Sequence, residues 1–217
     1  MQNLFAYVDH TALKPYTTWD EIKKLCQEAI EYGMASVCIP GCYVKRAHET
    51  FEELNICTVI GFPLGYNSTE SKIEEALQAV RDGACEIDMV INICNVKNKE
   101  YDKAEAEIAR VKEAVKDNIL KVIIETCYLE EEEKIAMCKA VTNAGADYIK
   151  TSTGFGTAGA SLADVCLMKE NIGENVKIKA AGGIKTKEEM EDYIRAGCSR
   201  IGTSSAISML LSHTGKS

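Results

Sequence analysis

One repeated unit of this chain begins at Lys177-Ile178-Lys179-Ala180-Ala181-Gly182-Gly183, a mostly apolar run that ends in two glycines. An amphipathic segment follows at 187–196, and a second short run occupies 200–203. Short apolar runs are typical of buried strands, whereas an apolar stripe at helical spacing is typical of a surface helix. The unit therefore predicts a strand, a helix and a second strand parallel to the first.

The same unit recurs from one end of the chain to the other. The expected strands occupy 6–9, 36–39, 57–61, 86–91, 121–125, 148–151, 177–181 and 200–203, and the clearest amphipathic helices occupy 18–32, 71–82, 102–116, 130–143 and 187–196. No linker rich in Pro, Gly or Ser divides the 217 residues. Eight parallel strands that alternate with helices favour one α/β domain over 1–217, a TIM (β/α)8 barrel. The first run is the weakest of the eight, and without it a doubly wound sheet would fit as well.

Local signals mark the ends of several helices. Thr186 and Glu189 have the spacing of a capping box, in which each residue bonds the backbone of the other. Glycines follow four of the expected helices, at positions 33, 83, 145 and 197. Glycine tolerates the left-handed conformation with which many helices end, so these positions are expected to close the helices.

Composition limits what the protein can bind and where it can work. The ten cysteines and three histidines do not cluster as a zinc site would require, so we expect free thiols, no metal and no cofactor. The first residues lack a basic segment, and nowhere do about 18 consecutive apolar residues occur. We therefore expect no membrane partner and a cytoplasmic location. A net charge of −8 argues against nucleic acid as a partner, although a local cationic pocket can still bind a small anion.

Two lysines lie near the ends of neighbouring strands. Lys150 comes just before a glycine loop, and Lys179 has the equivalent place in the next strand. A lysine with the reference pKa of about 10.4 is almost wholly protonated at neutral pH, so nucleophilic attack needs a neighbour that disfavours the ammonium. A second ammonium at roughly 6 Å supplies about 2.8 kcal/mol of repulsion at an effective dielectric of about 20, or roughly two pKa units. The pair predicts an activated amine, although a lysine at a strand end can also simply extend into solvent.

Charged residues alternate with apolar ones in the strand expected at 86–91. Glu86 and Asp88 share the face that points into a barrel, and the same parity turns Lys150 and Lys179 inward. Any one of these charges would carry a large desolvation cost if it were buried alone. We therefore expect Asp88 and the two lysines to form one cluster. The alternative is an ion network that only supports the fold.

Glycines and hydroxyls follow the last two expected strands. Gly182-Gly183 ends one strand, and Ser204-Ser205 follows the other, where a helix begins. Glycine lets the backbone approach an anion, and amides at a helix N-terminus donate to it. The corresponding loops of TIM barrels frequently bind phosphate. We predict a phosphate site here, to which the loop containing Gly154 can contribute, although turn and N-cap chemistry would explain either loop alone.

Other polar side chains near strand ends are candidates for binding a substrate. Asp9 and Thr11 follow the first strand, where they can hold a substrate hydroxyl or cap the next segment. Cys38 is small enough to line the floor of a pocket, with a core thiol as the alternative. Thr151, directly after the first lysine, is assigned to the same site. Glu125 ends the fifth strand and is expected to orient another group by hydrogen bonding.

Six blocks of the chain match a known family in the right order. They are DHTALK at 9–14, VIGFPLG at 59–65, EIDMVIN at 86–92, KVIIET at 121–126, YIKTSTGF at 148–155 and KAAGGI at 179–184. With these blocks the chain resembles the deoxyribose-phosphate aldolases, class I aldolases of deoxynucleoside breakdown. The resemblance implies a TIM barrel, no metal and a homodimer. It also implies reversible cleavage of 2-deoxy-D-ribose 5-phosphate to acetaldehyde and D-glyceraldehyde 3-phosphate.

The resemblance also implies roles for the matched positions. Lys150 corresponds to the lysine that forms the Schiff base, Lys179 to the lysine that perturbs it, and Asp88 to the carboxylate of the proton relay. The implied phosphate contacts are Gly154, Gly182, Gly183, Ser204 and Ser205. Some family members end in a tyrosine proposed to assist proton transfer, whereas residues 211–217 contain none. That step is therefore expected to depend on water and on the pair formed by Lys179 and Asp88.

Two other interpretations use the same residues. One is another phosphosugar barrel, either a different Schiff-base aldolase or an isomerase in which the lysines only bind anions. The other is a barrel that binds a sugar phosphate without converting it. Borohydride reduction with acetaldehyde separates an isomerase from a Schiff-base aldolase, because isomerisation leaves no reduced adduct. Release of acetaldehyde separates an enzyme from a binding protein.

Overall fold

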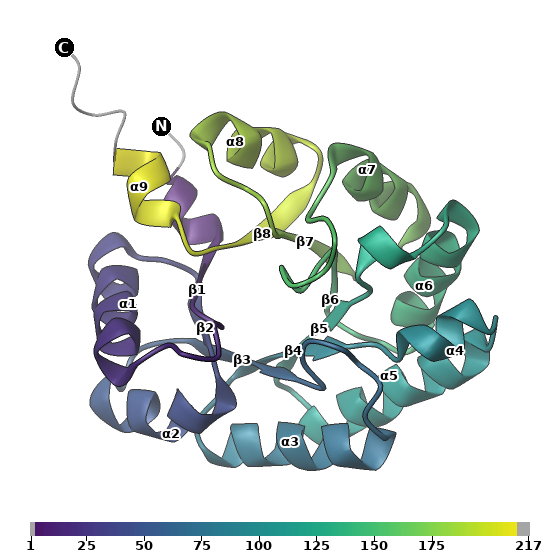
Figure 1. The fold of residues 1–217 in the computed structure, drawn as a ribbon, viewed down its shortest axis with the longest axis horizontal. Helices are drawn as coiled ribbons and strands as arrows, with labels where there is room; N and C mark the ends of the chain where they lie inside the picture. Colours follow the sequence, from purple (N-terminus) through teal and green to yellow (C-terminus); the bar gives the residue numbers. More distant parts are fainter. Residues whose placement is uncertain (1–2, 212–217) are drawn as a thin grey trace.

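Eight parallel strands close into a barrel in the computed structural model, which describes residues 3–211 (Figure 1). The strands are β1 (Val8–Thr11), β2 (Ser36–Ile39), β3 (Ile56–Ile60), β4 (Glu86–Val90), β5 (Ile119–Ile123), β6 (Tyr148–Lys150), β7 (Lys177–Ala181) and β8 (Cys198–Thr203). Each strand pairs with the next in sequence, and β8 closes on β1 with Ile201 opposite Val8. The predicted TIM barrel is confirmed, and the weakest of the predicted strands is present.

Helices form a ring around the barrel (Figure 1). They are α1 (Trp19–Tyr32), α2 (Gly41–Thr50), α3 (Thr69–Arg81), α4 (Ile93–Lys97), α5 (Tyr101–Val115), α6 (Glu131–Asn143), α7 (Leu162–Asn171), α8 (Lys187–Arg195) and α9 (Ala206–Leu211), with 3₁₀ helices η1 (Leu4–Tyr7) and η2 (Thr126–Tyr128). Sequence analysis predicted no helix at α2, α4 or α7. α7 lacks a clear apolar stripe and α4 has only five residues, so neither has the helical spacing on which that analysis depends.

Backbone conformation explains three of the strand boundaries that differ from the predictions. β1 begins at Val8 because Leu4–Tyr7 forms η1. β3 ends just before Gly61, whose φ of 58° takes the chain out of the strand region. β5 ends two residues before Glu125, whose φ of 50° turns the chain into η2. This turn separates the Glu125 side chain from the regular alternation of the strand.

The helix ends follow the local signals of the sequence. Glu189 Oε2 accepts a hydrogen bond from the Thr186 amide at 3.0 Å, and the Thr186 hydroxyl accepts one from the Glu189 amide at 3.1 Å. Gly33 closes α1 with a φ of 65°, and the glycines that follow α3, α6 and α8 also have positive φ. The predicted capping box and the glycine ends are confirmed.

Side chains of β4 alternate between two environments. Ile87 and Met89 are fully buried in the apolar core between the strands and the helices. Glu86 and Asp88 are also buried, but they point into the barrel. The apolar core therefore lies outside the barrel wall, and the interior of the barrel is charged.

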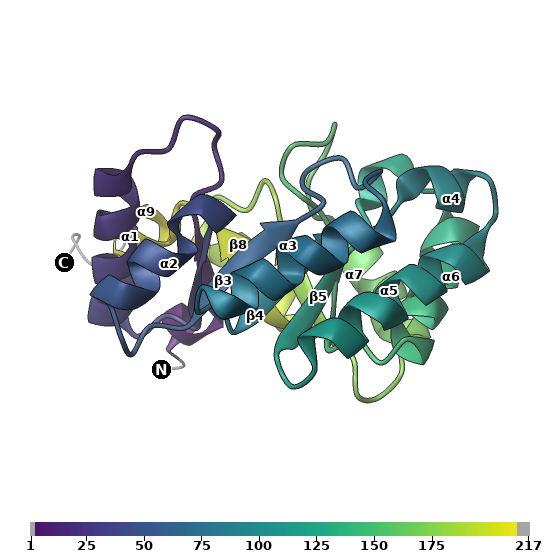
Figure 2. The same ribbon diagram turned by 90° about the horizontal axis from the view of Figure 1, so that it is seen from below.

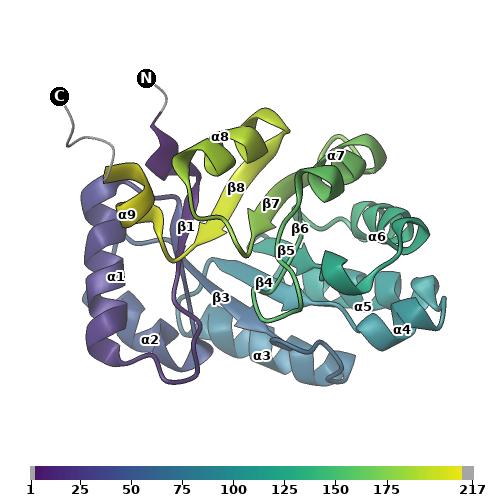
Figure 3. The same cartoon turned by 45° about the horizontal axis from the view of Figure 1, so that its top comes forward.

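A cavity of about 800 Å³ opens at the C-terminal ends of the strands, where it is lined by Thr11 of β1, Lys150 of β6, Ala181 of β7 and Thr203 of β8. Figure 2 shows the loops after β1, β3 and β6 rising on one side of the barrel. Figure 3 shows α9 beside α1, and residues of both helices line the cavity. Within residues 3–211, no helix has the length and apolar character needed to span a membrane. The cavity lies at the end of the barrel where TIM-barrel enzymes carry their reactive groups.

Candidate active site

Asp88 lies at the centre of a charged cluster inside the barrel. Its Oδ2 is 2.7 Å from the Nζ of Lys150 and 2.7 Å from the Nζ of Lys179, and its Oδ1 is 2.9 Å from the Nζ of Lys121. All four side chains are almost completely buried. Burial would raise the pKa of Asp88, but the three ammonium groups outweigh it and hold the pKa well below its usual range. The structure thus brings together the three residues predicted to form the cluster and adds Lys121.

Lys179 is held between two carboxylates. Its Nζ lies 2.5 Å from Asp9 Oδ2 and 2.7 Å from Asp88 Oδ2, and its side chain has no exposed surface. Burial would lower the pKa of Lys179, but the two carboxylates raise it above its usual value. These contacts favour the protonated form of Lys179 at neutral pH. It contacts the same oxygen as Lys150, so the two ammonium groups share one carboxylate, as expected for a cluster of Asp88 with both lysines.

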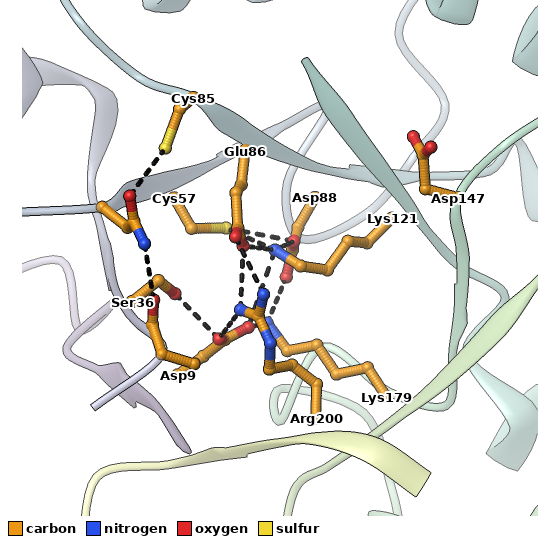
Figure 4. Close-up of polar contacts among 12 residues, drawn as sticks. Asp9, Ser36, Cys57, Cys85, Glu86, Asp88, Lys121, Asp147, Lys179 and Arg200 are labelled. Atoms are coloured by element: carbon orange, nitrogen blue, oxygen red, sulfur yellow. Dashed lines mark hydrogen bonds and ion pairs between the residues drawn. The ribbon is translucent and has the colours of Figure 1, made fainter. Parts of the chain in front are cut away.

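A second group of charges, formed by Glu86, Lys121 and Arg200, adjoins Asp9 and Asp88 (Figure 4). Lys121 Nζ is 2.5 Å from Glu86 Oε2. Arg200 donates from Nη2 to Glu86 Oε1 at 2.9 Å, and its Nη1 donates to Asp9. Burial would lower the pKa of Arg200, but Asp9 and Glu86 raise it. Lys121 and Arg200 therefore remain charged beneath the reactive end of the cluster.

Asp9 belongs to this network and does not line the cavity. Its Oδ1 accepts a hydrogen bond from the Ser36 hydroxyl at 2.8 Å, and its Oδ2 contacts Lys179. Burial would raise the pKa of Asp9, but Lys179, Lys121 and Arg200 lower it. In the structure the Asp9 carboxylate contacts Lys121, Lys179 and Arg200. Its predicted contact with a substrate hydroxyl stays a prediction.

Lys150 is the cation of the cluster that lines the cavity. The residues predicted to bind phosphate line the same cavity, and they are Gly154, Gly182, Gly183, Ser204 and Ser205. Gly182 and Gly183 have φ values of 85° and 80°, and a Cβ on Gly182 would lie 3.0 Å from the Cα of Gly159. Side chains are therefore excluded from this wall, which brings the backbone to the cavity surface.

One expected donor at this wall is already in use. The Ser205 amide donates to the Thr203 hydroxyl at 3.0 Å, and α9, which follows, has only six residues. The contact with an anion that was predicted for Ser205 would therefore come from its hydroxyl. Lys185, just beyond the two glycines, also lines the cavity and adds a cation that the sequence analysis did not single out.

The three other predicted substrate contacts lie in different surroundings. Thr11 lines the cavity, and its hydroxyl donates to the carbonyl of Asp9 at 2.8 Å. The Thr151 hydroxyl donates to the Ala181 carbonyl at 3.2 Å and accepts from the Ala181 amide at 3.1 Å, which ties β6 to β7. Cys38 is fully buried beside Asp88. The substrate-binding roles of Thr11, Thr151 and Cys38 stay predictions, and Thr11 alone of the three faces the cavity.

Two cysteines lie beside the carboxylate of Asp88. Ligand atoms of Cys38, Cys57 and Asp88 all lie within 4.8 Å of one another, a combination that can bind zinc. The same carboxylate is already held by three ammonium groups, which repel a metal cation. Burial also raises the pKa of Cys57 well above its usual value, so the thiol keeps its proton. These features argue against a metal at this corner, and the expectation of no metal stays a prediction.

Glu125 organises the loop that follows β6. Its Oε1 accepts from the Thr153 amide at 3.1 Å, and its Oε2 accepts from the Thr153 hydroxyl in a short hydrogen bond. The Thr153 hydroxyl oxygen in turn accepts from the Phe155 amide at 3.0 Å. Glu125 is 2% exposed, and burial raises its pKa. Its contacts are of the orienting kind that was expected, and they act on the loop that contains Gly154.

The sequence analysis did not single out Lys121 and Arg200. Lys121 interrupts an apolar strand at an inward position and lies opposite Asp88 in the register of β4 and β5, so alternation could have identified it. Arg200 gave no such signal, because its place opposite Lys179 depends on the register between β7 and β8. Residues 212–217, which include the end of the chain where the family tyrosine was sought, lie outside the described residues.

Comparisons with known proteins identify the family of this chain. A family model described as DeoC/LacD family aldolase matches residues 4–213. A deoxyribose-phosphate aldolase of Clostridium botulinum is 65% identical over 208 residues, which are 95% of this chain and 94% of that protein. The solved structure of an aldolase called QR15 has a TM-score of 0.94 and 41% identity, over 99% of this chain and 97% of that one. A tetrameric deoxyribose phosphate aldolase from Aeropyrum pernix has a TM-score of 0.91 and 29% identity, over 98% of this chain and 91% of that one. The chain belongs to the DeoC/LacD family of aldolases.

Proposed function

We propose that this aldolase reversibly cleaves 2-deoxy-D-ribose 5-phosphate to acetaldehyde and D-glyceraldehyde 3-phosphate through a Schiff base on Lys150, in the catabolism of deoxyribose phosphates. The observation that carries the proposal is the position of Lys150, which lines the cavity while its Nζ shares Asp88 Oδ2 with Lys179. The names of the relatives support the same substrate. A phosphorylated sugar is thus the substrate class.

The amine acts first as a nucleophile. Lys150 loses a proton, adds to the C1 aldehyde of the open-chain sugar and releases water to form an iminium. The bond between C2 and C3 then breaks, because this bond separates the two carbons of acetaldehyde from the three carbons of the other product. Its electron pair moves into the iminium and gives an enamine, while the C3 hydroxyl loses its proton and C3 becomes an aldehyde.

The same steps change the basicity of Asp88. In the resting cluster its carboxylate contacts three ammonium groups and is a poor base. When the Lys150 nitrogen becomes a neutral enamine, Asp88 loses one of these cations and binds a proton more readily. We infer that Asp88, with Lys179 and a water molecule, carries the C3 hydroxyl proton to C2 of the enamine. Hydrolysis of the resulting iminium releases acetaldehyde and restores the amine.

The phosphate group fixes the other end of the substrate. Its proposed contacts are the backbone at Gly154, Gly182 and Gly183 and the hydroxyls of Ser204 and Ser205, with Lys185 as a further cation. Because these residues line the same cavity as the reactive amine, phosphate binding would hold C1 to C3 against Lys150. Such positioning converts binding energy into rate.

Borohydride reduction in the presence of acetaldehyde tests the chemistry and the site together. The parent protein should gain an ethyl group on Lys150, located by peptide mapping. Lys150→Arg keeps the positive charge but removes the amine, so it should give neither adduct nor turnover. Lys14→Arg makes the same change at another lysine that lines the cavity, and it should still be labelled at Lys150. Labelling of a different lysine in the parent, or unchanged turnover in Lys150→Arg, would refute the assignment.

Assembly and location complete the proposal. We propose that the chain acts as a single-domain homodimer in the cytoplasm, without a cofactor. Sedimentation equilibrium measures the assembly, and cell fractionation measures the location. A monomer or a tetramer in solution would contradict the dimer.

A further inference from the structure

Arg200 and Glu86 belong to the charged cluster but do not line the cavity. Arg200 donates from Nη2 to Glu86 Oε1 at 2.9 Å and from Nη1 to Glu86 Oε2 at 3.0 Å. Its Nη1 also donates to Asp9. A substrate bound at Lys150 cannot touch this pair, so any influence of the pair on the reaction must pass through other residues.

A continuous chain of ion pairs joins this pair to Lys150, and its links from Glu86 through Lys121 to Asp88 are drawn in Figure 4. Glu86 Oε2 lies 2.5 Å from Lys121 Nζ, and the same Nζ lies 2.9 Å from Asp88 Oδ1. Asp88 Oδ2 lies 2.7 Å from Lys150 Nζ. The Arg200 side chain is 11% exposed and the others 3% or less. Solvent therefore screens these charges weakly, and a change at one end is felt at the other.

The network contains unequal numbers of positive and negative groups. Its carboxylates are those of Asp9, Glu86 and Asp88, and its cations are Lys121, Lys150, Lys179 and Arg200. Four cations against three carboxylates leave one positive charge in excess. An unbalanced buried charge is unfavourable, and the loss of one proton removes it. Lys150 is the cation of these four that faces the cavity, so the proton leaves most readily there.

We propose that Arg200 and Glu86 are positioning residues that set the pH at which Lys150 becomes a free amine. The inference rests on the proposed function, in which that amine forms the Schiff base. Arg200 is the cation that gives the network one more positive than negative charge. It therefore disfavours the protonated form of Lys150. Glu86 limits the excess to a single charge, which keeps Lys121 and Lys179 protonated while Lys150 reacts.

Other titratable groups around Lys150 form the background to this effect. They are Asp9 on β1, Cys38 on β2, Cys57 on β3, Asp88 on β4, Lys121 on β5, Tyr148 on β6, Lys179 on β7, and Glu125 after β5. Burial raises the pKa of Cys57, whereas the hydrogen bond with Cys57 lowers the pKa of Cys38. Glu125 binds Thr153 and has no ion pair with the network. All of these groups are kept in the variants below, so a change in pH dependence reports on Arg200 or Glu86.

Two substitutions with opposite effects on charge test the proposal. Arg200→Gln removes the excess positive charge, so the Lys150 ammonium is favoured and the acid limb of the activity profile should move to higher pH. Glu86→Gln adds to the excess, so the limb should move to lower pH. Each shift is expected to be about one pH unit, or about tenfold in rate on the limb. The measurements are the rate of adduct formation with acetaldehyde and cyanoborohydride, and kcat/KM for 2-deoxy-D-ribose 5-phosphate, both as functions of pH.

Three further variants separate charge from structure. Arg200→Gln combined with Glu86→Gln restores the excess to one charge and should return the profile to that of the parent. Arg200→Lys keeps the charge and should do the same. Arg195→Gln removes an exposed guanidinium on α8 and should cause no shift. If Arg200→Gln fails to fold, Glu86→Gln and the double variant still carry the test, since the first must shift and the second must return.

The outcomes are distinguishable. Opposite shifts with recovery in the double variant support the proposal. Loss of rate without a shift, or shifts in the same direction, overturns it and leaves the pair a purely structural role. The parent is measured first, because the absence of an adduct on Lys150 would mean that the proposed function has failed. If the adduct forms on Lys150 but its pH profile is the same in the Arg200 and Glu86 variants as in the parent, only this inference has failed.

Discussion

Lys72 and Glu107 form a buried ion pair outside the barrel, and Lys72→Met tests what the pair contributes. Lys72, on α3, has no exposed surface, and its Nζ donates to Glu107 Oε1 at 2.9 Å and to the Val90 carbonyl at 2.8 Å. Glu107, on α5, accepts from the Asn92 amide at 3.1 Å. The pair therefore ties two helices to the end of β4, two residues beyond Asp88.

The expected loss follows from what the substitution leaves behind. Methionine fills nearly the same volume, so the cavity contribution is small. Glu107 would remain 4% exposed with a single backbone donor, and breaking a buried ion pair from one side costs about 3–5 kcal/mol. The Val90 carbonyl would also lose a donor, at a cost of about 1–3 kcal/mol. Because the two costs share one site, we expect the free energy of unfolding to fall by about 4–6 kcal/mol.

Urea unfolding followed by circular dichroism measures this loss. Lys72→Met combined with Glu107→Leu leaves no unpaired charge, so the double variant should recover part of the stability. Lys103→Met removes an ammonium that is 64% exposed and paired with Glu100, and it should cost less than about 1 kcal/mol. A loss of less than about 1 kcal/mol for Lys72→Met, or a double variant no more stable than the single one, would contradict the reasoning.

Four further predictions concern the barrel interior and the loops around it. Lys179→Leu should move the activity optimum to higher pH by roughly one to two units, because a cation that opposes the reactive ammonium is lost; an unchanged pH–rate profile would count against this. Gly61→Ala should lower stability by roughly 1–3 kcal/mol in thermal unfolding, since its φ is 58° and its Cβ would lie 2.7 Å from the Cε of Lys72. The lowered pKa of Asp88 gives stability that is present above its unfolded pKa of about 3.9 and is lost as the pH falls toward the folded pKa, so the melting temperature should drop below about pH 4. The raised pKa of Glu125 has the opposite sign, because ionisation costs stability above an unfolded pKa of about 4.3. Glu125→Gln should therefore be more stable relative to the parent at pH 7 than at pH 4, and an equal difference at both would exclude this explanation.

The alternation of side chains between the two faces of each strand made the barrel interior predictable. Asp88, Lys150 and Lys179 each occupy an inward position of their own strand, and this position follows from alternation without knowledge of the partner strands. The desolvation cost of each charge then required that they meet. The central cluster could therefore be predicted from three separate short segments of sequence.

Contacts that depend on register were not predictable in the same way. Arg200 and Glu86 are 114 residues apart in sequence, and they meet only because β8 closes against β1. Lys72 and Glu107 lie on different helices, where each has the appearance of an ordinary surface charge. The conformation of Glu125, with a φ of 50°, removed its side chain from the alternation of β5. In each case the missing information was the relative placement of elements, which no local pattern contains.

Lys72 and Lys150 show why burial does not by itself identify the reactive lysine. Burial lowers the pKa of Lys72 despite the opposing effect of Glu107. Lys72 nevertheless has no exposed surface, lines no part of the cavity at the barrel mouth, and would leave Glu107 without its cation if it lost a proton. In the proposed mechanism, loss of the Lys150 proton leaves three cations for three carboxylates in the network. We therefore propose that the reactive lysine is the one at which an excess of buried positive charge and an opening to substrate coincide.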